Sequence, residues 1–363
     1  MNILQIFASK TWGGGEKYVL DLSKKLIELN HNVYFVSPKS EVIKNKTDKI
    51  ATLDFIPLRG VFDVFSAIKL SKLIKKNNID IVHCHNFKCA IVVMYALFLC
   101  RKNKTKFIMT RHLIKKSKNN FLYNLLYRQL NKIIFVSKLA MDIFISNCPK
   151  INHSKLIVIH NSILPIEKNC SSEPASILRN NGKVLLSYIG RLDKMKGVDV
   201  LLTALPKLKN TNYHLFIAGV GEDKDRLVSI VSDFNLNEKV TFLGFVEDVS
   251  TLMESIDIGI VPSIGQESFG LVLLEYMRAG KTIISTNNGA QTEFLDNNCA
   301  VLISPNNTEM LAEKIGELIE NKEKRQELGR NAKERFDKDF NYNIFLNKIL
   351  YVYNGNYTKP INN

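Results

Sequence analysis

Short apolar runs alternate with helix-like segments along the whole chain, and this alternation restricts the fold more than any other feature. Each short run suits a buried strand, and the segments between them repeat apolar residues at helical spacing. In the first half, the expected strands are Ile3–Ala8, Asn32–Val36, Ile79–His83, Phe107–Thr110 and Lys132–Val136. Such alternation predicts an α/β fold, with a parallel sheet covered by helices on both faces.

The same pattern starts again in the second half. Here the expected strands are Val184–Ile189, Tyr213–Ala218, Val240–Phe242, Ile258–Pro262 and Thr282–Ser285. Between the halves, Ile163–Gly182 is polar and rich in Pro and Asn, which is typical of a linker. A chain of 363 residues therefore divides into two doubly wound, Rossmann-like domains that face each other across a cleft. We expect domains at 1–165 and 166–339, and a helix and tail at 340–363 that can cross back to the first domain.

The net charge of +15 comes from the first half. Residues 1–165 hold 27 Lys and Arg against 9 Asp and Glu, whereas residues 166–363 hold 23 against 26. Two explanations stay open for this excess: an anionic partner, such as a membrane surface or a phosphorylated glycolipid, and a generally lysine-rich composition. Nucleic acid is poorly supported, because no recognition motif accompanies the charge. The densest cluster consists of Lys115, Lys116, Lys118, Arg128 and Lys132.

Cysteine usage and apolar segments favour a reducing compartment and no spanning helix. The six cysteines form no C-x-x-C pair, so they do not indicate a disulfide framework. The first residues lack the pattern of a signal peptide. The longest apolar run, Cys89–Cys100, is shorter than the roughly 20 residues that span a bilayer. We expect a buried helix there, with a helix that dips into a membrane face as the alternative.

Ligands of doubly wound sheets bind outside the carboxyl ends of the strands, so the loops after strands are the candidate sites. The first such loop is Thr11–Glu16, with glycines at 13, 14 and 15. It suits a diphosphate or acceptor contact at a helix N-terminus, or simply a tight turn. A dinucleotide site is disfavoured, because GGGEKY lacks the third glycine and Ser37 rather than an acid follows the second strand.

The loop Gly190–Gly197 follows the first strand of the second domain and carries two cations. Arg191 offers a planar fork for phosphate oxygens, and Lys196 offers a mobile point charge. Together they suit a pyrophosphate leaving group, although solvated surface charges are the default for isolated cations. The position at the rim of the cleft favours the functional interpretation.

The segment Val261–Glu275 is the most specific. A strand ends, a glycine-containing loop follows, and a helix is expected to begin near Ser268 or Phe269, with the amides of Phe269 and Gly270 able to hold phosphate or sugar oxygens. Glu267 and Glu275 are too far apart to share a proton, and each can accept a hydroxyl hydrogen bond.

These motifs resemble those of the retaining glycosyltransferases of family 4, and the resemblance covers most of the chain. Residues 267–275 (ESFGLVLLE) match the family's E-x7-E motif. Further similar elements are Gly190–Gly197, Ala218–Glu222, Val240–Phe245, Ser285–Ala290 and, more weakly, Gly13–Glu16 and Thr110–His112. The resemblance implies the GT-B fold and a nucleotide-sugar donor site in the second domain.

The resemblance also implies a role for single residues. Arg191 and Lys196 would neutralise the diphosphate, Glu275 would hold ribose hydroxyls, and Glu267 would contact sugar hydroxyls. His112 would hydrogen-bond the sugar near its anomeric carbon, so the catalytic set is His112, Glu267, Arg191 and Lys196. Donor binding would also involve Gly14, Gly15, Gly190, Gly219, Gly221, Phe245, Ser268, Phe269, Gly270 and Leu271. On the acceptor side, the candidates are Trp12, Glu16, His85 and Arg111.

No metal or cofactor is expected. Asp223 and Asp225 fall in the opening turn of a helix, where acids complement the helix dipole. The second D-x-D pattern, Asp337 to Asp339, lies in a charged helix. His83 and His85 share one strand face, but no second ligand cluster accompanies them.

The resulting hypothesis is a metal-independent, retaining hexosyltransferase at the inner face of the cytoplasmic membrane. It would transfer a sugar, with UDP as the expected nucleotide, to a glycan or glycolipid in bacterial envelope polysaccharide or lipopolysaccharide biosynthesis. Two alternatives stay open: a nucleotide-sugar epimerase of the same architecture, which needs no acceptor, and a non-catalytic nucleotide- or glycan-binding subunit.

Overall fold

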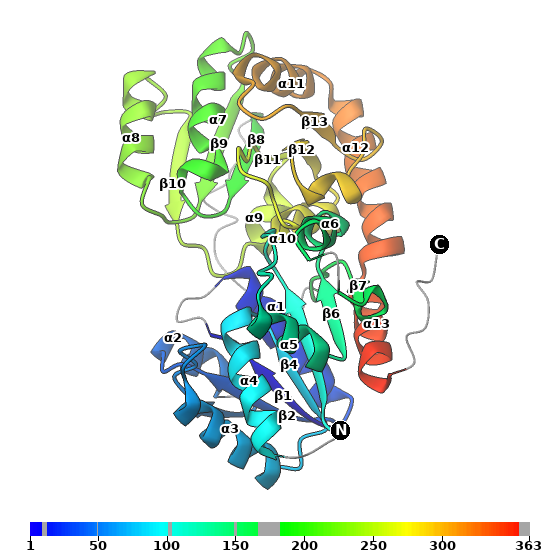
Figure 1. The fold of residues 1–363 in the computed structure, drawn as a ribbon. Coiled ribbons are helices and arrows are strands. Elements are labelled where there is room, and N and C mark those ends of the chain that lie inside the picture. The colour runs from blue at the N-terminus through cyan, green and yellow to red at the C-terminus, as the bar shows by residue number, and fades with distance from the viewer. Residues whose placement is uncertain (9–12, 49, 101–103, 149–150, 166–181, 356–363) are drawn as a thin grey trace. The chain divides into compact units, whose positions relative to one another are not determined.

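The chain forms two compact units (Figure 1). The computed structural model describes residues 1–8, 13–48, 50–100, 104–148, 151–165 and 182–355. The first unit comprises Met1–Asn161 and Tyr342–Asn363, and the second comprises Ser162–Asn341. Each unit is a parallel sheet covered by helices, which confirms the predicted α/β class with two Rossmann-like domains. The last helix belongs to the first unit, although the whole second unit precedes it in the chain.

The first unit is built on a seven-stranded parallel sheet with the order β3-β2-β1-β4-β5-β6-β7. Its strands are β1 (Asn2–Ile6), β2 (Asn32–Ser37), β3 (Thr52–Phe55), β4 (Ile81–Cys84), β5 (Lys106–Arg111), β6 (Lys132–Phe135) and β7 (Leu156–Val158). β1 pairs with β2 on one side and with β4 on the other, so the order in which successive strands are added to the sheet reverses at β1. β3 and β7 were not predicted from the sequence, because these edge strands are short and only partly buried.

Helices flank this sheet, and side chains cap many of their N-termini. The helices are α1 (Gly14–Glu28), α2 (Glu41–Thr47), α3 (Val64–Lys76), α4 (Phe87–Cys100), α5 (Phe121–Gln129), α6 (Lys138–Ser146) and α13 (Tyr342–Asn354), with a 3-10 turn at His153–Lys155. Ser40, Asp63, Asn120 and Ser137 each accept a hydrogen bond from an amide of the first helical turn. Such caps satisfy amides that have no partner within the helix.

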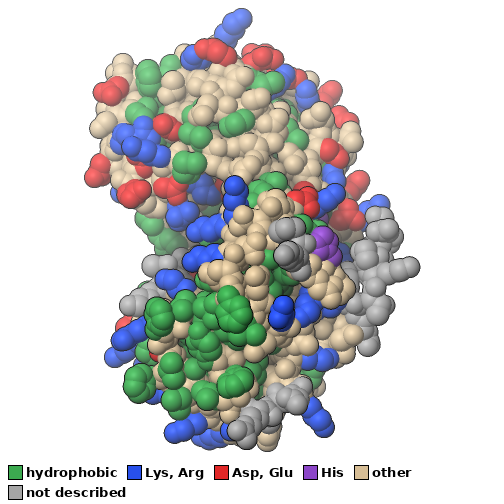
Figure 2. Space-filling model, in the orientation of Figure 1, with side chains coloured by type: hydrophobic (Ala, Val, Ile, Leu, Met, Phe, Trp, Pro, Cys, Tyr) green, Lys and Arg blue, Asp and Glu red, His purple; other side chains and the backbone are tan. Residues whose placement is uncertain are grey.

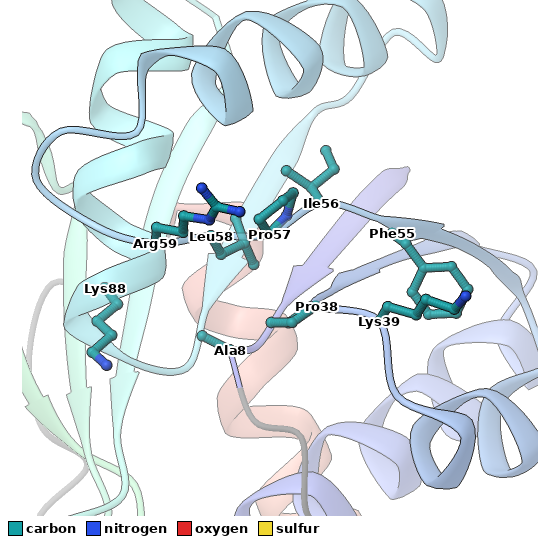
Figure 3. A pocket seen from close by; sticks show the side chains of 9 residues that line it. All are labelled: Ala8, Pro38, Lys39, Phe55, Ile56, Pro57, Leu58, Arg59 and Lys88. Atoms are coloured by element: carbon teal, nitrogen blue, oxygen red, sulfur yellow. The ribbon is translucent and has the colours of Figure 1, made fainter.

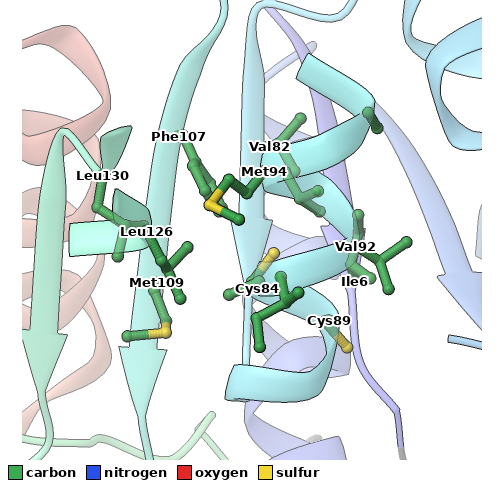
Figure 4. Close-up of a cluster of buried hydrophobic side chains, with 14 of the residues drawn as sticks. Ile6, Val82, Cys84, Cys89, Val92, Met94, Phe107, Met109, Leu126 and Leu130 are labelled. Carbon is green, nitrogen blue, oxygen red and sulfur yellow. The ribbon is translucent and has the colours of Figure 1, made fainter. Parts of the chain in front are cut away.

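The core of the first unit lies between α4 and the sheet (Figure 4). Cys89, Val92 and Met94 of α4 pack with strand residues such as Val82 and Phe107. The expectation of a buried helix over Cys89–Cys100 is therefore confirmed for most of its length, with Phe98 and Leu99 exposed at its end. Within the described residues, no helix combines the length and apolarity that crossing a membrane requires.

The second unit is built on a six-stranded parallel sheet with the order β10-β9-β8-β11-β12-β13. Its strands are β8 (Val184–Ile189), β9 (Tyr213–Ala218), β10 (Val240–Gly244), β11 (Ile258–Val261), β12 (Thr282–Thr286) and β13 (Val301–Ile303). β8 pairs with β9 on one side and with β11 on the other, so the strand order of this sheet reverses at β8, as that of the first sheet does at β1. The short edge strand β13 was again missed from the sequence.

The helices of the second unit lie on both faces of its sheet (Figure 1). They are α7 (Val198–Ala204), α8 (Lys224–Asp233), α9 (Ser250–Ser255), α10 (Leu271–Arg278), α11 (Thr308–Glu320) and α12 (Lys322–Arg335). Short helical turns are found at Lys194–Lys196, Leu205–Lys207, Ala290–Glu293 and Phe336–Phe340. The last of these is π-helical, so Asp337 and Asp339 do not lie in a regular α-helix.

The predicted start of α10 near Ser268 or Phe269 was wrong. The helix begins at Leu271, because Gly270 takes a left-handed conformation with φ of 86° and acts as the N-cap. The Phe269 side chain is buried and stacks on Phe294, with ring centroids 4.6 Å apart. Its role is therefore to anchor the loop before the helix, and the amides of the first helical turn start at Leu271.

Candidate functional site

In the second unit, an ion pair joins two of the predicted site residues. Lys196 ends the turn after β8, and Glu267 lies in the loop after β11. The Lys196 Nζ lies 2.6 Å from the Glu267 Oε1, and the Ser263 hydroxyl donates to the same oxygen at 2.5 Å. The Glu267 side chain is only 12% exposed. A partly buried carboxylate held by a cation and a hydroxyl has a fixed position, which suits a role in recognition.

The loop after β12 supports the Glu267 loop. The Ala290 amide donates to the Glu267 carbonyl at 2.9 Å, and the Asn288 side chain donates to the Ile264 carbonyl at 2.6 Å. A Cβ on Gly289 would lie 2.5 Å from the Glu267 backbone nitrogen, so only glycine fits there. The segment Ser285–Ala290, which the resemblance placed beside a diphosphate, thus also holds Glu267 in position.

Glycines let the loops after the strands pack backbone against backbone. A Cβ on Gly219 would lie 1.8 Å from the Gly190 carbonyl oxygen, and one on Gly221 would lie 2.1 Å from the Leu192 carbonyl oxygen. Gly197 has φ of 67°, and a Cβ there would lie 2.2 Å from the Pro262 carbonyl oxygen. We predicted Gly190, Gly219 and Gly221 as nucleotide-binding residues, and the structure gives them a packing role that needs no ligand.

Two of the predicted donor residues project into solvent. Arg191 is 79% exposed and lies 3.3 Å from Asp193, a pair that contributes little energy at the surface. Phe245 follows β10 and is 67% exposed. Glu275 lies on α10, half-buried, between core residues Leu274 and Tyr276. An exposed aromatic ring can stack on the ring of a ligand, and an exposed guanidinium group can bind phosphate oxygens.

The first unit contains a cavity of about 570 Å³, here called the main pocket. It gathers Gly15, Glu16, His85, Arg111 and His112, which the sequence singled out separately. Gly14 begins α1 beside them, and Trp12 lies outside the described residues. The remaining lining residues are Phe7, Ala8, Asn86, Phe87, Lys88, Thr110, Leu113, Lys115, Lys116 and Lys118.

Arg111 is held by packing. Its guanidinium carbon lies 4.6 Å from the centre of the Phe87 ring and 4.9 Å from that of Phe144. It donates to the Lys115 carbonyl at 2.5 Å, and burial lowers its pKa to about 10. Cation–π attraction to both rings holds the guanidinium group in place. Its hydrogen bond to the Lys115 carbonyl then fixes the loop that carries Lys115.

Behind the main pocket lies a network of hydrogen-bonded polar side chains. His85 Nδ1 lies 3.1 Å from His112 Nε2, and His85 Nε2 lies 2.9 Å from Gln5 Oε1. Gln5 in turn donates to the Tyr353 hydroxyl at 3.3 Å. That hydroxyl lies 2.7 Å from Nδ1 of His83. No sequence pattern pointed to Gln5 or Tyr353, because they are 348 positions apart.

The network leaves His83 no ring nitrogen for a metal. Its Nε2 lies 2.7 Å from the Thr110 hydroxyl, and its Nδ1 is taken by Tyr353. Both ring nitrogens of His85 are also occupied. Among the described residues, no cluster of three or more His, Cys, Asp or Glu side chains could hold a metal ion.

Burial lowers the pKa of all three histidines in this network. The pKa of His83 falls to about 3, where the neighbouring His112 adds to the effect of burial, and that of His112 falls to about 4. The pKa of His85 lies well below its usual value because of burial and then the two neighbouring histidines. All three rings are therefore neutral at pH 7.

A second pocket of about 440 Å³ adjoins the main pocket and shares Ala8 and Lys88 with it. Figure 3 shows Lys39, Arg59 and Lys88 around an apolar lining that includes Pro57 and Leu58. The three cations come from three separate segments of the chain. A pocket that combines several cations with an apolar lining suits an anionic ligand that has an apolar part.

An apolar patch lies at the start of α3 and consists of Phe62, Val64, Phe65 and Ile68. Phe62 is 95% exposed and Phe65 is 83% exposed. Figure 2 shows apolar side chains gathered over the face formed by α3 and α4. Phe62 is three residues from Arg59, which lines the second pocket. Contiguous exposed apolar side chains mark an interaction surface.

Two family profiles match consecutive parts of this chain. Residues 12–164 match Glycosyltransferase Family 4, and residues 171–335 match Glycosyl transferases group 1. Together they span both units.

Curated relatives and solved structures match over most of the chain. It is 28% identical over 353 residues to N-acetylgalactosamine-N,N'-diacetylbacillosaminyl-diphospho-undecaprenol 4-alpha-N-acetylgalactosaminyltransferase of Campylobacter jejuni, covering 90% of this chain and 93% of that protein. It is also 28% identical over 308 residues to phosphatidyl-myo-inositol mannosyltransferase of Propionibacterium freudenreichii, covering 78% and 75%. The crystal structure of Anabaena Alr3699/HepE in complex with UDP superposes with a TM-score of 0.85 at 20% identity, over 98% of this chain and 100% of that one.

The fold, the two family matches and the relatives agree with one another. They confirm the family that the sequence motifs predict. The chain has two parallel-sheet, Rossmann-like domains, and its structural neighbours have the GT-B fold. The chain belongs to the family 4 glycosyltransferases that carry the group 1 domain, with the GT-B fold.

Proposed function

We propose that this protein is a retaining glycosyltransferase that transfers a sugar from a UDP-sugar to a lipid-linked glycan acceptor at a membrane surface. The observation that carries the donor part is the Lys196–Glu267 pair, held by loops that glycines pack together. The UDP complex of the structural neighbour supports the choice of nucleotide.

The second unit would hold the nucleotide diphosphate. Lys196 and the exposed Arg191 follow the first strand of this unit, where cations can approach phosphate oxygens. Phe245 would stack on the base and Glu275 would accept hydrogen bonds from the ribose hydroxyls. Glu267 would bind sugar hydroxyls, and the open first turn of α10 would add amides from Leu271 onward.

Departure of the nucleoside diphosphate builds negative charge, which fixed cations stabilise better than water does. In the proposed reaction, the bond between the anomeric carbon and the diphosphate oxygen breaks. The acceptor oxygen forms its bond to the same face of the sugar, and its proton passes to an oxygen of the leaving phosphate. Lys196 and Arg191 supply positive charge, so we propose that no metal ion is needed.

The first unit would hold the acceptor. Its main pocket offers Glu16 and the carboxyl end of β5 for acceptor hydroxyls, and His112, which the resemblance assigns to the sugar near its anomeric carbon, lines the same pocket. The second pocket, with Lys39, Arg59 and Lys88, suits an anionic group, and the apolar patch suits a lipid surface. The names of the Campylobacter and Propionibacterium relatives, whose acceptors are lipid-linked, support this choice. We propose a location at the inner face of the cytoplasmic membrane and a role in building envelope polysaccharide.

The test is a transfer assay with UDP-sugars and polyprenyl-diphosphate-linked glycans, in buffer with EDTA. We expect a glycosylated lipid with the anomeric configuration of the donor, as measured from the proton coupling constant of the product. Lys196→Ala should lower kcat by about 100- to 1000-fold, the range for loss of one group that stabilises developing negative charge. Lys194→Ala, which removes an exposed lysine of the same turn, is the matched control.

Three outcomes would contradict the proposal. A product of inverted configuration would exclude retention, and activity that disappears with EDTA would exclude metal independence. Conversion of the UDP-sugar to an epimer in the absence of acceptor would favour the epimerase alternative.

A further inference from the structure

The hydrogen-bonded network behind the main pocket has a direction that can be read from its donors and acceptors. The starting point is Gln5, whose amide oxygen can only accept and whose amide nitrogen can only donate. Its Oε1 faces His85 Nε2 at 2.9 Å, and its Nε2 faces the Tyr353 hydroxyl at 3.3 Å. His85 Nε2 therefore carries a proton.

The same donor-to-acceptor order can be followed from His85 to His112, which lines the main pocket. His85 is neutral, so with Nε2 protonated its Nδ1 has a lone pair and can only accept. His112 Nε2 lies 3.1 Å from that atom and must donate the proton. His112 is also neutral, so its Nδ1 is left as a hydrogen-bond acceptor. This atom forms no hydrogen bond within the part of the chain that the structure describes.

The other arm of the network is compatible with the same direction. The Tyr353 hydroxyl accepts from Gln5 and so donates its own proton to Nδ1 of His83, 2.7 Å away. His83 then carries its proton on Nε2 and donates to the Thr110 hydroxyl at 2.7 Å. Reversing the Gln5 amide would reverse every one of these bonds. His112 would then present an N–H donor instead of a lone pair.

We propose that Gln5 and Tyr353 are positioning residues that set the tautomer of His112, so that its Nδ1 accepts a hydrogen bond from a sugar hydroxyl in the main pocket. The identity of the bound group as a sugar rests on the proposed function, whereas the assignment of the His112 tautomer does not. Tyr353 belongs to α13, so the last helix of the first unit takes part in the network that sets which hydrogen-bonding group the pocket offers.

The setting of the network explains why a tautomer can be held there. Gln5 and His83 are fully buried and lie opposite each other on the paired strands β1 and β4. The Tyr18 ring packs edge-on against His85 and His112, with centroids 5.7 and 4.8 Å apart. Water has little access to these groups and does not replace their side-chain partners. Each hydrogen bond therefore constrains the next.

The direct test is nitrogen NMR of the full-length protein with 15N-labelled histidine. We expect His112 to show a protonated Nε2 and a bare Nδ1, and His85 to show the same pattern. A protonated Nδ1 on His112 would overturn the proposal. Substitution of each histidine by Gln, one at a time, assigns the signals.

Two variants test the role of the distant residues. Tyr353→Phe removes the hydroxyl that accepts from the Gln5 amide and donates to His83, and Gln5→Met removes the acceptor of His85. In both, His112 should become a mixture of tautomers, while far-UV circular dichroism stays unchanged. Tyr351→Phe is the matched control, because it removes an exposed hydroxyl from the same helix. An unchanged His112 tautomer in both Tyr353→Phe and Gln5→Met would overturn the proposal.

Kinetics then separate this proposal from the proposed function. If transfer occurs, Tyr353→Phe should raise the KM for the sugar bound at His112 several-fold, with a smaller change in kcat. A change in kcat alone would contradict the binding role of Nδ1. If the tautomer is as predicted but no acceptor is glycosylated, the proposed function fails and the assignment of the network stands.

Discussion

The two units build their candidate sites in different ways. In the second unit, short loops after β8, β9, β11 and β12 touch through their backbones, and glycines make that contact possible. In the first unit, the main pocket is supported by buried side chains from β1, β4, β5 and α13. The first arrangement depends on the absence of Cβ atoms, and the second depends on the match of donors and acceptors. Each should therefore fail under a different kind of substitution.

The largest effect is expected where a Cβ is added between loops of the second unit. Gly219→Ala would place a carbon on the Gly190 carbonyl, at a φ of 155° that disfavours side chains. Overpacking and backbone strain together should lower the free energy of unfolding by about 4 kcal/mol. Chemical unfolding followed by circular dichroism measures this change.

Gly182→Ala separates the two causes. Gly182 also has a positive φ, of 80°, but open space surrounds the position of its Cβ. It should show only the strain, about 1–2 kcal/mol. Equal destabilisation by the two variants would show that contact between the loops is not what requires Gly219.

The next largest effect concerns the charge of Glu267, which accepts from Lys196 and Ser263. Glu267→Gln keeps the shape of the side chain but removes the charge from both bonds. Turnover should fall by about 10- to 100-fold, because hydrogen bonds to a charged group contribute about 1.5–3 kcal/mol. Steady-state kinetics measure the loss, with the exposed Glu238→Gln as control. If both variants retain full turnover, the pair has no part in the reaction.

The histidine network of the first unit predicts a dependence of stability on acid. The pKa values of His83 and His112 fall to about 3 and about 4, so the folded unit does not bind protons there between pH 6.5 and 4. The unfolded chain does, with ordinary histidine pKa values near 6.5. The free energy of unfolding should therefore fall as the pH is lowered through this window, by up to about 1.4 kcal/mol per pH unit for each histidine.

His83→Gln provides the check, because glutamine can keep a hydrogen bond but does not titrate. Denaturation at several pH values should show a slope reduced by about one proton relative to the unmodified protein. A slope that stays the same would mean that His83 is not the buried neutral group described here.

The smallest effect is expected at the surface of the first unit. Replacing Phe62 and Phe65 by Ser removes two exposed rings from the apolar patch. Sedimentation with vesicles that contain phosphatidylglycerol should show several-fold weaker binding, whereas the stability should barely change. Phe234→Ser, at an exposed ring of the second unit, is the control. Equal binding by all three proteins would contradict the role proposed for the patch.

The contrast between the units also explains what the sequence predicted well. The second unit's site residues lie in compact motifs, such as Gly190–Gly197 and Glu267–Glu275, and their spacing is visible without a structure. The central strands were found because each is dominated by apolar residues. Of the edge strands that were missed, β3 is interrupted by a polar residue, and β7 and β13 are only three residues long.

The first unit's site was only partly predicted, for a physical reason. His85, Arg111 and His112 could be proposed because they lie at or just after the carboxyl ends of strands. Gln5 and Tyr353 could not, because their contact joins the first strand to the last helix. The start of α10 was misplaced because nothing in the local pattern shows that Gly270 is left-handed and that Phe269 points into the core.

The measurement that tests the account most directly is the thermal stability of the protein with UDP, in buffer with EDTA. UDP at about 100 times its dissociation constant should add about 2.7 kcal/mol of stability and raise the Tm accordingly. The account predicts this rise for the unmodified protein and for Lys194→Ala, and its loss in Lys196→Ala. No rise with UDP, or an equal rise in Lys196→Ala, would contradict the claim that the loops of the second unit hold a nucleoside diphosphate.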